Sequence, residues 1–420
     1  MSDVSLIKIS GPDQTGITQA ATAILSDYAV NILDIGQAVI HNNLALGILA
    51  EMPDSVDIAA CFSRLREAVE KLGMSIEFDA VSGDDYQHWI SEQGKPRHIL
   101  TLLVRKVSAE HINAVTSLAA QYDLNIDKIT RLSGRVPLNA DEQSKACVEF
   151  SMRGELSDQI KVRRALLELT NTLDMDIAYQ EDDMFRRNRR LVVFDMDSTL
   201  IEAEVIDELA KVAGVGAEVS AITELAMQGE IDFDESFRRR VALLSGLNES
   251  ALQQVADRLQ LTEGAETLIS TLKRLGYKTA ILSGGFSYFA NQLRDQLGFD
   301  YVYANQLDIH AGVVTGEVVG DIINGERKAE LLKDIAQREN IALEQVIAVG
   351  DGANDLPMLS VAGLGIAFRA KPIVKASARQ SISTLGLDSI IYLLGISDRE
   401  PVSYTHLRAH ETVLDLVCRL

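Results

Sequence analysis

Alternating apolar and polar residues divide the chain into two parts with different patterns. Through residue 181, short alternating runs typical of half-exposed strands are interleaved with amphipathic segments typical of helices. The order strand, helix, strand, strand, helix, strand occurs over 1–82 and again over 97–181, separated by a polar stretch that contains Trp89. This order predicts two ferredoxin-like units of the α+β class. The expected elements are strands 5–10, 32–40, 44–52 and 75–81 with helices 17–28 and 56–72, and then strands 98–106, 124–132, 146–152 and 175–179 with helices 109–122 and 159–173.

Beyond residue 190 the pattern changes to short, continuous apolar runs. Residues 191–194, 278–282 and 345–349 are of this kind, which is typical of strands that are covered on both faces of a parallel sheet. Each run ends in a polar or glycine-rich turn, and ligands of such sheets bind beyond the carboxyl ends of the strands. We therefore expect an α/β domain over 190–396 with its site at these turns.

Two carboxylates directly follow the first of these runs. If the strand continued that far, alternation would place Asp195 and Asp197 on the same side, where both can address one small site. A calcium loop is excluded because Thr199 stands at its fifth position and no glycine follows. An acidic turn without function is the alternative interpretation.

The other two runs end in groups that suit a phosphate and a metal ion. Ser283 offers a hydroxyl, and the glycine at position 284 lets backbone amides approach an oxyanion closely. Asp351 and Asp355 add the hard oxygen ligands that magnesium prefers. Between these turns, Lys328 stands where a helical pattern begins, and a lysine there opposes the helix dipole unless it has an anionic partner.

These motifs occur in the order that characterises the haloacid dehalogenase superfamily, which the segment from Leu191 to Leu394 resembles. Within it, the segment is similar to the phosphoserine phosphatase family. The resemblance implies a Rossmann-like core with a parallel sheet and a small helical cap over about 204–262. It also implies Mg²⁺-dependent hydrolysis of phosphoserine to serine and phosphate through an aspartyl-phosphate, the last step of serine biosynthesis.

The resemblance further assigns roles to residues at the matching positions. It makes Asp195 the nucleophile and Asp197 the proton carrier, and it places the metal on Asp195, the backbone carbonyl of Asp197 and Asp351, supported by Asp355. The residues expected to bind substrate are Ser283, Gly284 and Lys328 at the phosphoryl group, Glu204 at the ammonium, Arg240 at the carboxylate, Met227 and Phe233 between these groups, and Asn354 at metal-bound water or substrate.

The turn at Asp13 to Gly16 resembles the ligand loop of ACT domains, which commonly bind amino acids and pair through their sheets. Both ferredoxin-like units are therefore expected to be ACT-like, the second by its pattern alone. Binding of an amino-acid effector is one interpretation of the loop. In the other, Asp13 or Thr15 simply caps a helix and the units serve structure or homodimerisation.

Composition narrows the possible partners. The net charge of −21 argues against nucleic acid, and no apolar stretch approaches the length of a membrane span or a secretory leader, so we expect a cytoplasmic protein without a membrane partner. The three cysteines show neither metal spacing nor a disulfide pattern. The basic stretch 186–190 is interpreted as the face of a linker. Residues 397–420 form an extension of unknown role in which His406 and His410 are spaced like a metal pair without further ligands.

Two other functions stay open at this point. One is a related phosphotransferase or a phosphatase of another small phosphorylated metabolite. The other, from a different class, is an amino-acid-sensing regulatory protein with an inactive core, against which the intact set of acids and Lys328 argues.

Overall fold

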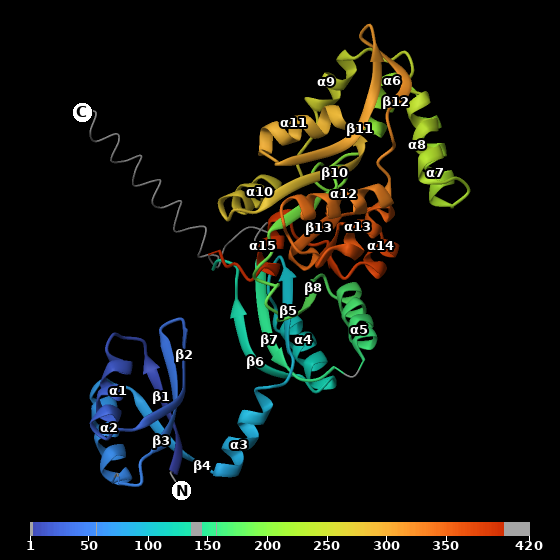
Figure 1. The fold of residues 1–420 in the computed structure, drawn as a ribbon. Coiled ribbons are helices and arrows are strands. Elements are labelled where there is room, and N and C mark those ends of the chain that lie inside the picture. The colour runs from blue at the N-terminus through green and yellow to red at the C-terminus, as the bar shows by residue number, and fades with distance from the viewer. Residues whose placement is uncertain (1–2, 56, 136–144, 157, 399–420) are drawn as a thin grey trace, which may run out of the picture. The chain divides into compact units, whose positions relative to one another are not determined.

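The computed structural model describes residues 3–55, 57–135, 145–156 and 158–398, with the side chains of 159 and 160 excepted (Figure 1). Two compact units follow one another along the chain, Met1–Lys95 and Pro96–Leu420, and each is described by itself. In the part of the chain described, no helix is both long and apolar enough to cross a bilayer. The terminal histidine pair lies outside the described residues.

The first unit contains a four-stranded antiparallel sheet in the order β2-β3-β1-β4. Alternate residues of β3, beginning with Leu44, are buried against the helices α1 and α2, as period-two patterning requires. This confirms the predicted ferredoxin-like fold. The elements are β1 (Asp3–Pro12), α1 (Ile17–Asp27), β2 (Asn31–Ile40), β3 (Asn43–Met52), α2 (Ile58–Lys71) and β4 (Ser75–Val81).

The entry into α1 differs from the capping that the sequence predicts. Gly16 is the N-cap residue, with a φ of 93° in the left-handed region, and no side chain caps the helix. The interpretation of Asp13 or Thr15 as the cap is therefore wrong. The side chain of Gln14 instead donates a hydrogen bond to the carbonyl oxygen of Leu72 at 2.5 Å.

The polar stretch between the two ferredoxin-like units forms a helix that the sequence analysis did not predict, α3 (Gly83–Glu92). Ser82 caps it by accepting a hydrogen bond from the backbone N–H of Asp85 at 3.1 Å. Tyr86, Trp89 and Ile90 share one face of α3, but none of them is buried, and polar residues make up most of the segment.

The second unit begins with another four-stranded antiparallel sheet, in the order β6-β7-β5-β8. Its core is formed by the sheet and by α4 and α5. The second ferredoxin-like domain is thus confirmed as well. Its elements are β5 (Arg97–Val104), α4 (Ala109–Gln121), β6 (Asn125–Arg131), β7 (Ala146–Arg153), α5 (Gln159–Thr172) and β8 (Asp176–Glu181).

The C-terminal domain, β9 to α15, is built on a seven-stranded sheet in the order β12-β11-β10-β9-β13-β14-β15. All neighbouring strands are parallel except β11 and β12, so the expected α/β core with a parallel sheet is confirmed. The strands are β9 (Leu191–Phe194), β10 (Lys278–Phe286), β11 (Tyr301–His310), β12 (Val313–Val319), β13 (Val346–Gly350), β14 (Leu364–Phe368) and β15 (Gln380–Ile382).

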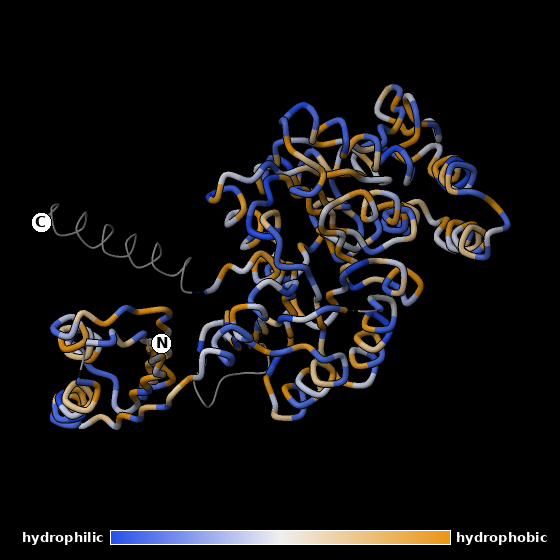
Figure 2. Tube along the Cα trace, turned by 60° about the horizontal axis from the view of Figure 1, so that its bottom comes forward, coloured by the Kyte–Doolittle hydropathy of each residue, from blue (hydrophilic) through white to orange (hydrophobic). Residues whose placement is uncertain are grey.

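Helices cover both faces of this sheet and form a cap beyond it (Figure 1). Helices α10 and α11 pack on one face and α12 and α13 on the other. Hydrophobic and hydrophilic positions are mixed along the helical coils of the trace (Figure 2). The cap consists of α6 to α9, within the expected range. The helices are α6 (Val205–Ala213), α7 (Gly216–Met227), α8 (Phe233–Ala242), α9 (Ser250–Ala256), α10 (Ala265–Arg274), α11 (Ser287–Leu297), α12 (Gly325–Arg338), α13 (Leu356–Val361), α14 (Pro372–Ser377) and α15 (Ile390–Leu393), with short 3-10 turns η1 (Leu343–Gln345), η2 (Ala353–Asp355) and η3 (Leu387–Ser389).

The basic stretch before β9 is not the solvated linker face that the sequence analysis expected. Arg186 is fully buried and paired with Glu149 of β7, and Arg189 is 6% exposed and donates to the carbonyl oxygen of Glu344. The prediction was wrong because the second ferredoxin-like domain packs directly against the C-terminal domain. The sequence of a basic run does not reveal which distant acid or carbonyl oxygen its arginines will contact.

Candidate active site

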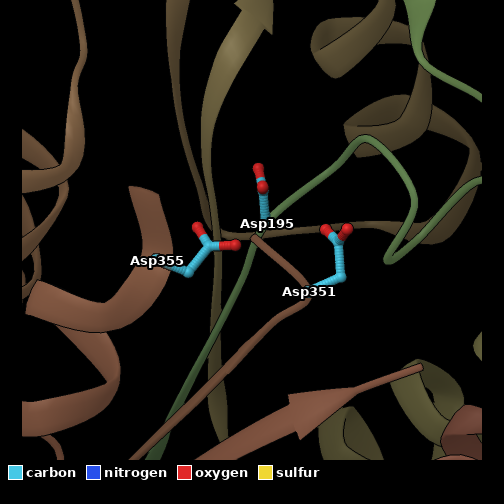
Figure 3. A group of neighbouring side chains, drawn as sticks. All are labelled: Asp195, Asp351 and Asp355. Atoms are coloured by element: carbon cyan, nitrogen blue, oxygen red, sulfur yellow. The ribbon is translucent and has the colours of Figure 1, made fainter. Parts of the chain in front are cut away.

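Three carboxylates lie together beyond the carboxyl ends of two central strands (Figure 3). Strands β9 and β13 are parallel neighbours in which Phe194 and Val349 are paired, so Asp195 and Asp351 follow at the same edge of the sheet. Asp355 comes from η2, one turn further along. Oxygen atoms of the three side chains lie within 4.8 Å of one another.

A fully buried lysine joins two of these acids. The Nζ atom of Lys328 lies 2.8 Å from Oδ1 of Asp195 and 2.8 Å from Oδ1 of Asp355. Its helix, α12, comes close enough because Gly325 lacks a side chain: a β carbon there would lie 2.6 Å from the carbonyl oxygen of Asn354. The anionic partner expected for a lysine in the first turn is therefore a pair of carboxylates.

Within the described residues, this one buried lysine faces a larger negative charge. Burial and then the charge of Asp355 raise the pKa of Asp195 well above its usual value, and the same two causes raise the pKa of Asp351 to about 7. Burial alone would lower the pKa of Lys328, but its ion pairs with Asp195 and Asp355 raise it instead. Clustered carboxylates with excess negative charge are suited to a hard divalent cation such as Mg²⁺.

The two oxygens of Asp195 have different surroundings. Oδ1 accepts a hydrogen bond from the backbone N–H of Met196 at 2.7 Å and also contacts Lys328. Oδ2 forms no hydrogen bond with any residue that the structure describes. One oxygen is thus held in place while the other is available to a ligand.

Asp197 occupies a different environment, although it is only two residues away. Its Oδ1 accepts a hydrogen bond from the N–H of Val205 at 2.8 Å, and its Oδ2 accepts one from Oγ of Ser283 at 3.3 Å. Burial, followed by the negative charge of Glu204, raises the pKa of Asp197 to about 8. A carboxyl with so high a pKa is suited to carry a proton near neutral pH.

The glycine-rich segment at the end of β10 has no room for larger side chains. A β carbon on Gly285 would lie 2.3 Å from Oδ2 of Asp197, and one on Gly284 would lie 3.0 Å from the ring of Phe233. The N–H of Gly285 also donates to Oγ of Ser283 at 2.8 Å. The structure thus brings Ser283, Gly284 and the cap residue Phe233 to one place next to Asp197.

Sequence reasoning missed Asn305, which positions this segment. It is 3% exposed on β11, donates to the carbonyl oxygen of Gly284 at 2.8 Å and accepts a hydrogen bond from the N–H of Ile323 at 2.8 Å. The same strand also contains Gln306 and Asp308, so no signal in the sequence singled out this asparagine. Thr199 was missed too, and its hydroxyl donates to Asp351 at 3.3 Å.

Two of the expected cap residues carry opposite charges near Asp197. Glu204 is the exposed N-cap residue of α6 and accepts a hydrogen bond from Oγ of Ser198 at 2.8 Å. Arg240 on α8 is half-buried, and burial lowers its pKa while the nearby acids Asp207, Glu204 and Asp197 oppose that shift. Both side chains are thus positioned to meet charges of a ligand that reaches Asp197.

The remaining two predicted residues are less closely tied to the acids. Met227 at the end of α7 is 65% exposed, and its sulfur lies 3.6 Å from Nζ of Lys371, so the structure does not bring it to Asp195. Asn354 belongs to η2, and its Oδ1 folds back over Gly352, where a β carbon would lie 2.2 Å away. Its side chain is therefore at the loop that carries Asp351.

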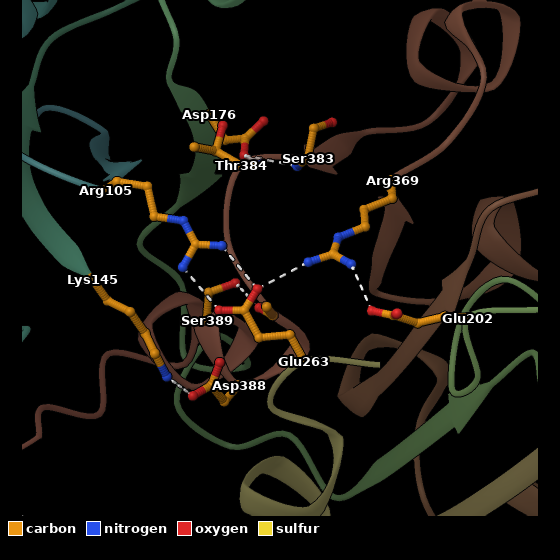
Figure 4. A network of polar contacts seen from close by, with 11 residues as sticks. Arg105, Lys145, Asp176, Glu202, Glu263, Arg369, Ser383, Thr384, Asp388 and Ser389 are labelled. Carbon is orange, nitrogen blue, oxygen red and sulfur yellow. Dashed lines mark hydrogen bonds and ion pairs between the residues drawn. The ribbon is translucent and has the colours of Figure 1, made fainter. Parts of the chain in front are cut away.

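The two connections between cap and sheet run side by side and are held by charges (Figure 4). Arg369 pairs with Glu202 on the outgoing connection at 3.4 Å and with Glu263 on the returning one at 3.0 Å. Arg105, just after β5 of the second ferredoxin-like domain, forms two hydrogen bonds of 2.8 Å with Glu263. That domain is therefore connected to the hinge of the cap, which sequence reasoning did not foresee.

Comparison with protein families agrees with this division of the chain. A model described as haloacid dehalogenase-like hydrolase matches residues 189–363, and two ACT domain models match residues 4–79 and 96–180. Phosphoserine phosphatase of Streptomyces coelicolor is 39% identical over 395 residues, which cover 94% of this chain and 93% of the relative. A phosphoserine phosphatase of Mycobacterium tuberculosis is 39% identical over 94% of both chains.

Solved structures are similar over most of the chain. A haloacid dehalogenase family hydrolase from Salmonella enterica serovar Typhi has a TM-score of 0.62 and 32% identity, covering 70% of this chain and 98% of that one. An unliganded probable phosphoserine phosphatase from Vibrio cholerae has a TM-score of 0.56 and 34% identity, covering 71% of this chain and 86% of that one.

The buried lysine predicts a test of stability. In Lys328→Met, Asp195 and Asp355 lose their shared cation, and we expect the free energy of unfolding to fall by about 3 kcal/mol at neutral pH. Chemical denaturation measures this loss. Lys333→Met, an exposed position on the same helix, is the control and should change stability by less than about 0.5 kcal/mol. Equal stability of Lys328→Met and the native protein would contradict the ion pairs.

Proposed function

The chain belongs to the phosphoserine phosphatase family of haloacid dehalogenase-like hydrolases, and on this basis we propose that it hydrolyses O-phosphoserine to serine and phosphate through an aspartyl-phosphate. It is a phosphatase with two ACT domains ahead of the catalytic domain. The observation that carries the mechanism is the contrast between two carboxyls: Asp195 contacts Lys328 through Oδ1 and leaves Oδ2 without a hydrogen bond among the described residues, while Asp197 beside it accepts hydrogen bonds on both oxygens. The reaction would complete serine biosynthesis.

In the first step, Asp195 attacks phosphorus. Its Oδ2 forms a bond to phosphorus as the bond from phosphorus to the serine oxygen breaks, and Asp197 gives its proton to that oxygen. Ser283, the amide of Gly284 and Lys328 would hold the phosphoryl oxygens, whose negative charge grows in the transition state. Because phosphoryl transfer depends mainly on position and charge, these fixed donors supply much of the acceleration.

In the second step, the carboxylate of Asp197 takes a proton from water. That water attacks phosphorus, releases phosphate and returns Asp195 to its original form, while Asp197 regains its proton. The raised pKa of Asp197 favours this exchange, since its two protonation states are then both accessible near neutral pH.

The acidic cluster fits a resident Mg²⁺ ion. Asp195, the backbone carbonyl of Asp197 and Asp351 would hold it, and Asp355 would support them through Lys328 and through the N–H of Gly352, which donates to its Oδ2 at 3.0 Å. When bound, magnesium lowers the pKa of adjacent carboxyls and neutralises charge on a phosphoryl group. Asp195, whose pKa is otherwise raised, would then be ionised for attack.

The cap would select the substrate. We assign Glu204 to the ammonium of phosphoserine and Arg240 to its carboxylate, because both face the region of Asp197 and carry the matching charges. Phe233 lies at the phosphate-binding turn and would cover the short carbon chain between these groups. We keep Met227 from the family pattern as a residue that would reach the substrate only in another position of the cap.

For the first ACT domain, amino-acid binding is a second proposal. The left-handed Gly16 and the lack of a capping side chain leave the N-terminus of α1 without a side-chain acceptor. A carboxylate is suited to such a position.

Replacement of the nucleophile tests the chemistry. We expect Asp195→Asn to lower phosphate release from phosphoserine by about 10⁴-fold or more, because an amide is a poor nucleophile. Steady-state assays measure the loss, and circular dichroism checks the fold. The exposed Asp295→Asn is the control. Undiminished turnover by Asp195→Asn would rule out the mechanism.

Magnesium binding should depend on pH with a definite sign. A carboxyl whose pKa is about 7 is mainly protonated below that pH and must release its proton before it can bind a cation. Affinity should therefore fall from about pH 8 to about pH 6, and protons should be released on binding. Calorimetry in two buffers of different ionisation enthalpy measures both. An affinity that does not change with pH would contradict the raised pKa of Asp351.

Substrate selection can be tested on α8. We expect Arg240→Ala to lower kcat/KM for phosphoserine about 10- to 100-fold, the loss of a charged hydrogen bond, and to affect an aryl phosphate without a carboxylate much less. Arg238→Ala, an exposed arginine on the same helix, is the control and should affect neither substrate. Equal losses on both substrates with Arg240→Ala would show that the residue does not read the carboxylate.

A further inference from the structure

A cavity of about 510 Å³ lies between the second ACT domain and the catalytic domain. Helix α5 and strand β8 form one wall, and α14, β15 and the beginning of β14 form the other. The walls are in direct contact, since Arg163 of α5 donates to the carbonyl oxygens of Ser377 and Ala378 after α14. None of the acids of the catalytic site lines this cavity.

Two further contacts fix the floor of the cavity. The side-chain amide of Gln380 on β15 receives a hydrogen bond from the N–H of Tyr179 at 2.9 Å and donates one to the carbonyl oxygen of the same residue. One glutamine thus ties β8 of the ACT domain to the edge of the catalytic sheet. The cavity is consequently part of a built interface between two domains.

Four cations line the cavity: Arg163, Arg189, Lys375 and Arg379. Arg189 is 6% exposed, and its Nε atom has no hydrogen-bond partner among the described residues. The side chains of Lys375 and Arg379 take part in no hydrogen bond or ion pair within the described part of the chain. Their positive charges are therefore still available to a ligand.

The cavity has an excess of positive charge, whereas the chain as a whole has an excess of negative charge. The chain has 40 lysines and arginines against 61 acidic residues, yet the cavity has two acids, Glu181 and Asp183, against four cations. Asp183 already accepts hydrogen bonds of 2.9 Å from the N–H groups of Phe185 and Arg186. Burial and then the charge of Arg379 lower the pKa of Arg163, so these guanidinium groups repel each other until an anion joins them.

The rest of the lining contains an apolar patch beside polar residues such as Thr170, Gln180 and Ser381. Val162, Leu166 and Leu167 come from α5, Ile177 from β8 and Leu364 from β14. A ligand that fills this space needs an apolar body as well as a charged group. The volume is within the range of about 300–1,000 Å³ that is typical of small-molecule sites.

We propose that this cavity is a binding site for a small organic anion, whose carboxylate or phosphate group contacts the cluster of arginines and whose apolar body packs against α5. The site is separate from the catalytic centre and from the loop of the first ACT domain, and it does not depend on the proposed reaction. Since its walls belong to two domains, an occupant stabilises their association by mass action.

The test uses the full-length protein and two probes, phenylphosphonate and phenylacetate. Both combine an apolar ring with an anionic group, the phosphonate cannot be hydrolysed, and the comparison distinguishes a phosphate site from a carboxylate site. Calorimetry measures their affinity for the native protein and for the double variant Lys375→Gln/Arg379→Gln. The control is Arg294→Gln, which replaces an arginine on α11 that does not line the cavity. Neither replacement in the double variant removes a hydrogen bond among described residues.

We expect at least one probe to bind the native protein and the Arg294→Gln control equally, and to bind the double variant about tenfold more weakly or worse. Hydrogen exchange locates the site independently, because binding there should slow exchange in α5 and α14. This readout distinguishes the cavity from the catalytic centre, where a phosphonate can also bind. Absence of saturable binding by both probes, or binding that the double variant leaves unchanged, would overturn the proposal.

Discussion

The buried ion pairs of Lys328 are the interaction on which the site depends. They join the end of β9 to the 3-10 turn after β13, so two segments that are distant in sequence keep their acids within 4.8 Å of one another. Removing such charges from water is costly, and the cost is offset only while each carboxylate keeps its partner. The same lysine leaves more negative charge than it neutralises, which is why the cluster is suited to a divalent cation.

The difference between two neighbouring aspartates follows from this arrangement. Asp195 faces the lysine and the cluster, whereas Asp197 faces a hydroxyl and the first amide of the cap. In the proposed mechanism, the first carboxyl attacks and the second carries a proton. The cap is bound to the same site, since the N–H of Val205 at the start of α6 donates to Asp197 and Arg369 holds both of its connections.

Much of the fold could be predicted because it follows from local patterns. Continuous apolar runs such as Leu191–Phe194 identify strands that are covered on both faces, and the turn after each run identifies the site. What depends on contacts between distant segments could not be predicted. The burial of Arg186 depends on Glu149, and the role of Asn305 depends on the glycine-rich segment that it contacts. Helix α3 buries none of its residues, and its mostly polar composition hid it in the sequence.

The central claim is that the phosphoryl group passes through Asp195. Acid quenching of the enzyme during turnover of phosphoserine, followed by proteolysis and mass spectrometry, locates any covalent phosphoryl group. The account predicts that it is found on the carboxyl of Asp195. A phosphoryl group on Asp197 or on another residue, or turnover without any covalent species on the time scale of the reaction, would contradict it.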